Sequence, residues 1–150
     1  MIIIVMDLQK KKEMLINSLI NEGILRTPEI IEAFRRVRRE DFVLPQYREH
    51  AYVDEPLPIM EGQTISQPLT VAAMTEALQP KAGQKILEVG AGSGYQAAVL
   101  AEIVGQKGKI ITLERLRALV EFARKNLRIC GYTNAVVIEG DGTLGYENRK

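Results

Sequence analysis

The sequence has little cysteine, little net charge and no long apolar run, and each scarcity excludes a class of protein. The single cysteine, Cys130, cannot form an internal disulfide or a multi-cysteine metal site. The 20 basic and 19 acidic residues leave a net charge of +1, so bulk attraction to nucleic acid or to an anionic membrane is not expected. The apolar run at residues 1–6 is too short to cross a bilayer, and Met6 is an alternative start site. A cytoplasmic protein with no metal, nucleic-acid or membrane partner is therefore favoured.

The first third of the chain has the pattern of two helices. Asp7 can cap a helix that runs to Asn21, with Gly23 just beyond its end. The apolar stripe of that helix is expected to comprise Leu8, Met14, Leu15, Leu19 and Ile20. Thr27 and Pro28 predict the start of a second helix, whose apolar face comprises Ile30, Ile31, Phe34 and Val37. We interpret the basic run on this helix as a solvated surface; it comprises Arg35, Arg36, Arg38 and Arg39.

The remainder of the chain divides into a long irregular stretch and a run of alternating elements. Residues 42–68 hold four prolines and several apolar side chains, which indicates a packed functional loop. A helix is expected at 71–78, ended by Pro80. Strands are expected at 85–89, 109–113 and 135–139, with helices at 95–104 and 115–129. This β-α-β-α-β order predicts one α/β domain with a parallel sheet, and the strands are apolar on both faces, as in a helix-covered sheet.

The most informative segment is the glycine-rich turn between the first of these strands and its helix. It reads Glu88-Val89-Gly90-Ala91-Gly92-Ser93-Gly94, and Glu114 follows at the end of the next strand. An acidic side chain at that distance can accept hydrogen bonds from both hydroxyls of a ribose. Tyr95 stands where a dinucleotide fingerprint requires glycine. The alternative is that the three glycines only make a tight turn.

The acidic-x-Gly-x-Gly-x-Gly pattern resembles motif I of the Rossmann-like methyltransferases that depend on S-adenosylmethionine. That cofactor carries no phosphate, so no phosphate cradle is needed. Asp141 and Gly142 follow the third strand, where an acidic side chain can reach the exocyclic amine of an adenine. The alternative for this pair is an ordinary strand-ending turn.

The end of the irregular stretch carries a second motif, Gly62-Gln63-Thr64-Ile65-Ser66-Gln67-Pro68. Thr64 or Ser66 alone could be a helix cap, and a lone serine is not the signal of a nucleophile. His50, the single histidine, has no evident acidic partner, so a loop hydrogen bond is expected for it.

This second motif, with Val71-Ala72-x-Met74 after it, resembles the signature of the protein-L-isoaspartate (D-aspartate) O-methyltransferases. The segments Arg36–Val43, Glu88–Gly94 and Gly140–Tyr146 are similar to that family in the same order. The resemblance implies methylation of the carboxylate of L-isoaspartyl and D-aspartyl residues in damaged proteins. The ester then closes to a succinimide, part of which reopens as aspartate. The cofactor-contacting positions that it implies are Thr64, Ile65, Glu88, Gly90, Gly92, Gly94, Glu114, Asp141 and Gly142.

Ser66 matches the serine that the resemblance implies as the catalytic residue. The acceptor carboxylate has a pKa of about 4 and is already ionised, so it needs no general base. Orientation of an oxygen against an activated methyl group can supply roughly 7–11 kcal/mol. We therefore hypothesise that Ser66 donates a hydrogen bond that aims the carboxylate.

The sequence departs from the family pattern at its end. Family members continue past the position of Lys150 with a strand that begins with a Pro-Tyr-Asp-type segment and pairs with the strand at 85–89. The expected architecture is thus N-terminal helices and a substrate loop at 1–68, with 69–150 as the first half of the cofactor-binding sheet and the C-terminal strands missing. Because a bare apolar edge promotes pairing, we expect low stability or self-association through this edge. Two alternatives to a repair enzyme stay open: an inactive fragment or cofactor-binding module, and a methyltransferase with another acceptor.

Overall fold

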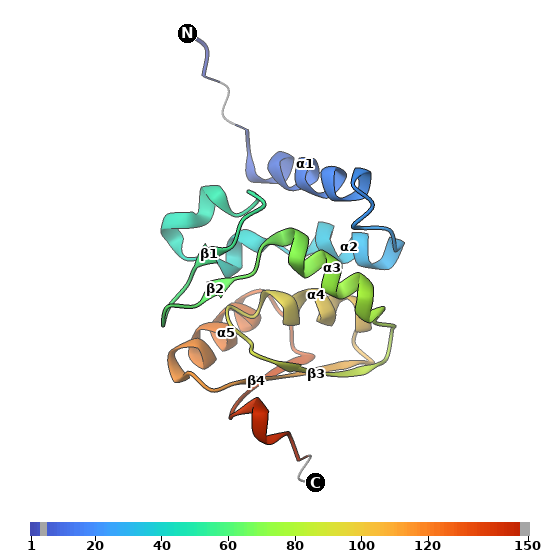
Figure 1. Cartoon of the computed structure of the whole chain (residues 1–150), viewed down its shortest axis with the longest axis vertical. Coiled ribbons are helices and arrows are strands. Elements are labelled where there is room, and N and C mark those ends of the chain that lie inside the picture. Colours follow the sequence, from blue (N-terminus) through green and yellow to red (C-terminus); the bar gives the residue numbers. More distant parts are fainter. Residues whose placement is uncertain (4–5, 148–150) are drawn as a thin grey trace.

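The computed structural model describes residues 1–3 and 6–147, so parts of the apolar run at 1–6 and of the chain end lie outside the described residues. The parallel sheet lies at one end of the molecule and the helices are stacked above one of its faces (Figure 1). The first helix, α1 (Leu8–Asn21), lies farthest from the sheet. Below it come α2 (Pro28–Arg36) and α3 (Pro68–Leu78), and then α4 (Tyr95–Val104) and α5 (Arg117–Ile129).

The two ends of α1 are as predicted, whereas its buried face differs. The Asp7 carboxylate accepts a hydrogen bond from the Lys10 amide at 2.8 Å, and Gly23 follows the helix in a left-handed conformation. The buried residues are Lys12, Ile16 and Leu19. Met14, predicted on the apolar stripe, is 55% exposed because the i, i+4, i+7 face centred on Ile16 packs inward instead.

The second helix corrects the interpretation of the basic run. It ends at Arg36, and Val37 is already extended, so Arg38 and Arg39 lie beyond the helix. Arg39 begins a short 3-10 helix, η1 (Arg39–Phe42), and is completely buried. The prediction of a solvated surface is therefore wrong for Arg39. The run of basic residues in the sequence does not reveal that the helix ends at Arg36, about one turn before Arg39.

The stretch expected to be irregular contains short elements. A second 3-10 helix, η2 (Pro45–His50), is followed by an antiparallel hairpin of β1 (Leu57–Pro58) and β2 (Thr64–Ile65). Strands of two residues are too short to show an alternating apolar pattern, which is why the sequence did not indicate them. The hairpin leads directly into α3, which ends at Gln79 in a left-handed conformation before Pro80, as predicted.

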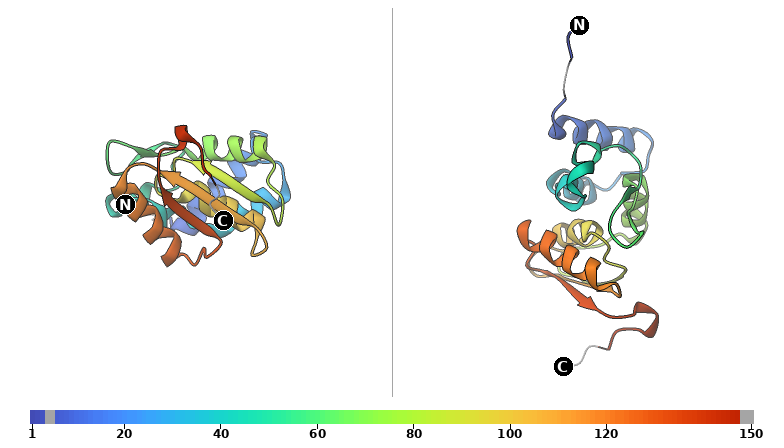
Figure 2. Two further views of the ribbon diagram at one scale, coloured as in Figure 1. Left: turned by 90° about the horizontal axis from the view of Figure 1, so that it is seen from below. Right: turned by 90° about the vertical axis from the view of Figure 1, so that its left-hand side faces the viewer.

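The β-α-β-α-β prediction is confirmed almost residue for residue. The strands are β3 (Lys85–Val89), β4 (Lys109–Glu114) and β5 (Ala135–Glu139), all parallel and in the order β3-β4-β5. A 3-10 turn, η3 (Gly142–Leu144), follows β5. Figure 2 shows α4 and α5 on the same face of this sheet.

The opposite face of the sheet carries no α-helix within residues 1–3 and 6–147, only the short η3 (Figure 1), in contrast to the expectation of a helix-covered sheet. Leu87 pairs in register with Ile111, and Ile111 with Val136, so one apolar row crosses this face. Leu87 is 49% and Val89 62% exposed. As expected, β3 is an edge strand of the described sheet.

Candidate functional site

A cavity of about 710 Å³ lies where the hairpin, α3 and the glycine turn meet. Its wall consists of Thr64–Ser66, one side of α3, β3, the turn at 90–93 and the first residues of α4. The two sequence motifs that were singled out independently thus line one space. The space follows the edge strand β3 and reaches its carboxyl end at the glycine turn, where open α/β sheets usually bind their ligands.

The glycine turn holds its backbone in a conformation that other residues rarely adopt. The φ angles of Gly90, Gly92 and Gly94 are +91°, +53° and +89°. A Cβ atom built on Gly90 would meet no described atom within 4 Å, and Gly90 lines the cavity, so a side chain there would project into open ligand space. The turn therefore allows a ligand to approach the backbone closely.

The amide groups of the turn are largely used within the protein. Gly90 and Ala91 both donate to the Leu113 carbonyl, at 2.7 and 3.1 Å, and Gly92 donates to Oε2 of Glu114 at 3.0 Å. A phosphate-binding loop instead directs its amides at the ligand. This arrangement favours a nucleoside ligand without phosphate groups.

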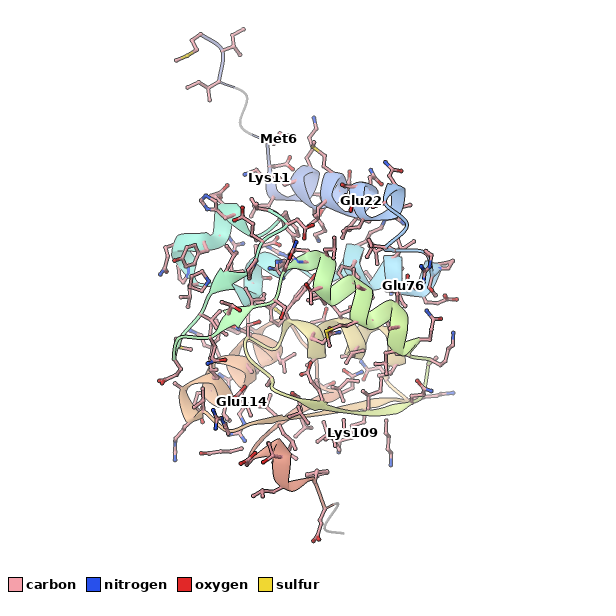
Figure 3. All side chains as sticks on the ribbon, in the orientation of Figure 1. Met6, Lys11, Glu22, Glu76, Lys109 and Glu114 are labelled. Atoms are coloured by element: carbon pink, nitrogen blue, oxygen red, sulfur yellow. The ribbon has the colours of Figure 1, made fainter. Side chains whose placement is uncertain are left out.

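Glu114 is located as predicted, at the end of β4 beside the turn (Figure 3). Its second oxygen accepts from the Leu116 amide at 3.1 Å, so both carboxylate oxygens are anchored by backbone donors. A carboxylate has about four lone-pair sites, so acceptor capacity is left for ribose hydroxyls. Although it does not line the cavity itself, Glu114 touches the turn that does.

Glu88 on β3 lines the same cavity. The Thr112 hydroxyl on the neighbouring strand donates to Oε1 of Glu88 at 2.6 Å. Burial raises the pKa of Glu88 to about 7, the Thr112 bond partly offsets this, and the charge of Glu114 adds to it. A cationic group of a ligand at this position would favour the ionised carboxylate.

The Thr64–Ser66 segment faces the cavity from the hairpin side. Ile65 is buried, whereas Thr64 and Ser66 are exposed. Neither hydroxyl caps α3: the N-cap is Gln67, and the carboxylate of Asp54 accepts from the Leu69 amide at 2.9 Å. The capping alternative for Thr64 and Ser66 is therefore wrong, and both residues line the cavity.

Besides Glu114, three further predicted cofactor positions do not line the cavity: Gly94, Asp141 and Gly142. A Cβ on Gly94 would lie 3.3 Å from the Leu127 side chain, so this glycine allows α4 to approach α5. Asp141 accepts hydrogen bonds from the amide and hydroxyl of Thr143 and caps η3. A Cβ on Gly142 would fall 2.3 Å from the Val89 side chain, so η3 packs against the end of β3. The cofactor roles of these residues, like those of the residues that line the cavity, stay predictions.

The sequence did not reveal two residues, Arg39 and Asp54, that contact elements lining the cavity. The Arg39 guanidinium lies 5.0 Å from the centre of the Tyr95 ring, and Tyr95 lines the cavity. Asp54 caps α3 from 15 residues upstream. No local spacing links either residue to the motifs. By contrast, His50 is exposed, and its carbonyl accepts from the Val53 amide.

Neither a metal cluster nor a membrane-spanning helix is found in the described ranges 1–3 and 6–147. They contain no cluster of three or more His, Cys, Asp or Glu side chains arranged to hold a metal ion. No helix in these ranges combines the length and hydropathy needed to span a membrane.

Comparisons with known proteins point to one family. The sequence pattern of the family described as protein-L-isoaspartate (D-aspartate) O-methyltransferase matches residues 9–150. A protein-L-isoaspartate O-methyltransferase of Ignicoccus hospitalis is 50% identical over 139 residues, which cover 93% of this chain and 66% of that protein. The chain spans less than two thirds of the length of the curated relatives that it matches.

Solved structures agree in fold. A protein-L-isoaspartate O-methyltransferase structure superimposes with a TM-score of 0.77 at 33% identity, covering 87% of this chain and 42% of the other. A Plasmodium falciparum beta-aspartate methyltransferase in complex with S-adenosyl-L-homocysteine gives 0.76 at 26% identity, covering 87% and 62%. The Rossmann-like methyltransferase fold is thereby confirmed for the region that is covered.

Proposed function

The chain belongs to the protein-L-isoaspartate (D-aspartate) O-methyltransferase family, and on this premise we propose that it methylates isoaspartyl and D-aspartyl carboxylates in damaged proteins. The observation that carries the proposal is the single cavity lined by both Ser66 and the glycine turn. An acceptor bound at Ser66 would lie beside a cofactor bound at the turn. In the proposed division of the domain, residues 1–68 supply the acceptor side and residues 69–150 the cofactor side.

The proposed cofactor is S-adenosylmethionine, and the residues present fit its chemistry. Glu114 offers acceptors for ribose hydroxyls, Glu88 an acidic group for an ammonium, and the turn at Gly90 and Gly92 a close backbone approach. Three amides of the turn are committed to Leu113 and Glu114, which suits a ligand without phosphates. When bound, this cofactor supplies a methyl group on a sulfonium, which is already electrophilic.

The residues of the chain then need only to orient the acceptor. Glu114, Glu88 and the turn would hold the cofactor, and its methyl group would pass to a carboxylate oxygen, with a methyl ester and a neutral thioether as the products. No proton moves in this step, so a general base is not required. The exposed Ser66 hydroxyl, free of helix capping, would donate the hydrogen bond that aims the carboxylate.

Self-association is the second part of the proposal. The edge strand β3 exposes Leu87 and Val89, and a second copy of the chain that pairs there would cover both. We also place the protein in the cytoplasm, an inference supported by its single free cysteine, Cys130.

The proposal is tested by separating acceptor orientation from cofactor binding. Loss of one hydrogen bond to a charged group, about 1.5–3 kcal/mol, predicts that Ser66→Ala lowers kcat for an isoaspartyl peptide by roughly 10- to 100-fold. Its affinity for S-adenosylhomocysteine, measured by calorimetry, should change less than about twofold. Glu114→Gln should show the reverse pattern, and Ser18→Ala on α1 is the control for loss of a remote hydroxyl. An equal loss of turnover and cofactor affinity in Ser66→Ala would contradict the assignment.

A further inference from the structure

The loop at residues 51–55 is held from two sides by charged side chains. Nε of Arg39 donates to the Ala51 carbonyl at 2.7 Å, and Nη2 donates to the Glu55 carbonyl at 3.5 Å. On the other side, the Asp54 carboxylate of this loop accepts from the Leu69 amide in the first turn of α3. The loop therefore connects Arg39 to the start of α3, two residues beyond Ser66.

Arg39 also contacts the other half of the site. Its guanidinium lies over the ring of Tyr95, the first residue of α4 after the glycine turn. Tyr95 is itself packed edge-on against Phe34 and Phe42, so its ring is fixed. Arg39 therefore contacts both the loop at 51–55 and α4, so it fixes the position of this loop relative to the helix that follows the glycine turn.

The electrostatics indicate that Arg39 is more than a packing residue. Its side chain is completely buried, and Nη1 has no hydrogen-bond partner among the described residues. Burial lowers the pKa of Arg39, and the Tyr95 and Tyr52 hydroxyls and the Asp54 carboxylate oppose this. A buried charge without full pairing is costly, and an apolar side chain of similar volume would avoid that cost. The two carbonyl bonds give it a geometric role that an apolar residue cannot supply.

Asp54 has a comparable role at α3. Gln67 is the N-cap but makes no side-chain cap bond, so the Leu69 amide depends on Asp54. Because Ser66 directly precedes the N-cap Gln67, its position depends on where Asp54 holds the first turn of α3. The hairpin also lies against the glycine turn, because a Cβ built on Gly92 would be 3.8 Å from Cδ1 of Ile59.

We propose that Arg39 and Asp54 are positioning residues, which through the loop at 51–55 hold Ser66 in register with the glycine turn. This inference rests on the proposed function, because it concerns the alignment of an acceptor with a methyl donor. A displacement of about 1 Å can lower a rate by about 10²-fold. Neither side chain needs to touch the substrate to have that effect.

The test compares Asp54→Ala with the loss of a second carboxylate that accepts backbone amides, Glu76 near the other end of α3. Glu76, on α3 and away from Glu114 in Figure 3, accepts from the Arg26 and Thr27 amides at 2.7 and 2.8 Å before α2. Asp54→Ala is expected to lower kcat/KM for an isoaspartyl peptide by about 10²-fold, with the S-adenosylhomocysteine Kd within about threefold of wild type. Glu76→Ala should leave kcat/KM within about threefold. Asp54→Asn, which retains an oxygen acceptor, should restore most of the rate.

Amide hydrogen exchange separates this inference from the proposed function. Asp54→Ala and Arg39→Lys should each raise exchange at residues 64–69 at least about tenfold above any rise caused by Glu76→Ala. If the wild-type chain methylates no isoaspartyl peptide, the proposed function fails, and exchange alone decides whether the two residues hold this segment. Unchanged exchange at 64–69, or an equal fall of kcat/KM in Asp54→Ala and Glu76→Ala, would overturn the inference. If Asp54→Ala does not fold, Asp54→Asn and Arg39→Lys carry the same comparison.

Discussion

Replacing Glu88 by glutamine should change how the stability of the chain depends on pH. Burial raises the pKa of this carboxyl from its ordinary value of 4.5 to about 7. Below pH 4.5 the group is protonated in both the folded and the unfolded chain. Between pH 4.5 and 7 the folded chain binds more protons than the unfolded chain, so its stability falls as the pH rises. Above pH 7 the loss of folding free energy caused by this carboxyl is complete.

The magnitude follows from the size of the pKa displacement. At about 1.4 kcal/mol for each tenfold change in the ionisation constant, the deficit at pH 8.5 is about 3 kcal/mol. Glutamine is uncharged at every pH and keeps an oxygen to accept the Thr112 hydroxyl. Glu88→Gln should therefore be more stable than wild type by about 3 kcal/mol at pH 8.5, and by less than about 1 kcal/mol at pH 5.

Urea denaturation followed by far-ultraviolet circular dichroism suits this test, because the chain has no tryptophan. Glu139→Gln, at the exposed end of β5, is the control for the amide substitution itself. A gain from Glu88→Gln that is equal at pH 5 and pH 8.5 would refute the reasoning, since the effect must come from ionisation of the half-buried Glu88 carboxyl.

Two further predictions concern packing and association. Gly94→Ala should lower the free energy of unfolding by about 1–3 kcal/mol, because φ is +89° and the new Cβ would lie 3.3 Å from Leu127; an unchanged melting temperature would contradict this. Leu87→Lys on the exposed face of β3 should shift sedimentation toward the monomer, whereas Met14→Lys, at a similarly exposed position on α1, should not. Equal sedimentation of wild type and both variants would remove β3 as the site of association.

The sequence predicted the parts of the molecule that depend on local patterns. The strands at 85–89, 109–114 and 135–139 are short apolar runs between turn residues, and they form as expected. The glycine turn and Glu114 were found together because parallel strands bring their carboxyl ends to one edge. Local pattern and tertiary structure agree in this half of the chain.

The supporting contacts could not be predicted, because they depend on pairs far apart in the sequence. Asp54 meets the Leu69 amide, and Glu76 meets Arg26 and Thr27, only after α3 has packed against the N-terminal helices. The burial of Arg39 was missed because a run of basic residues usually marks a solvated face. In each case a polar side chain forms a hydrogen bond with a backbone group of another segment.

The most direct test of the proposed function is methyl transfer from labelled S-adenosylmethionine to two peptides that differ only in one residue, isoaspartate or normal aspartate. The account predicts base-labile label on the isoaspartyl peptide and none on its aspartyl counterpart, with Ser66→Ala reducing the signal. Equal labelling of both peptides would contradict the proposed acceptor. No labelling of either, by a chain that still binds S-adenosylhomocysteine, would contradict transfer by this chain and favour a cofactor-binding module.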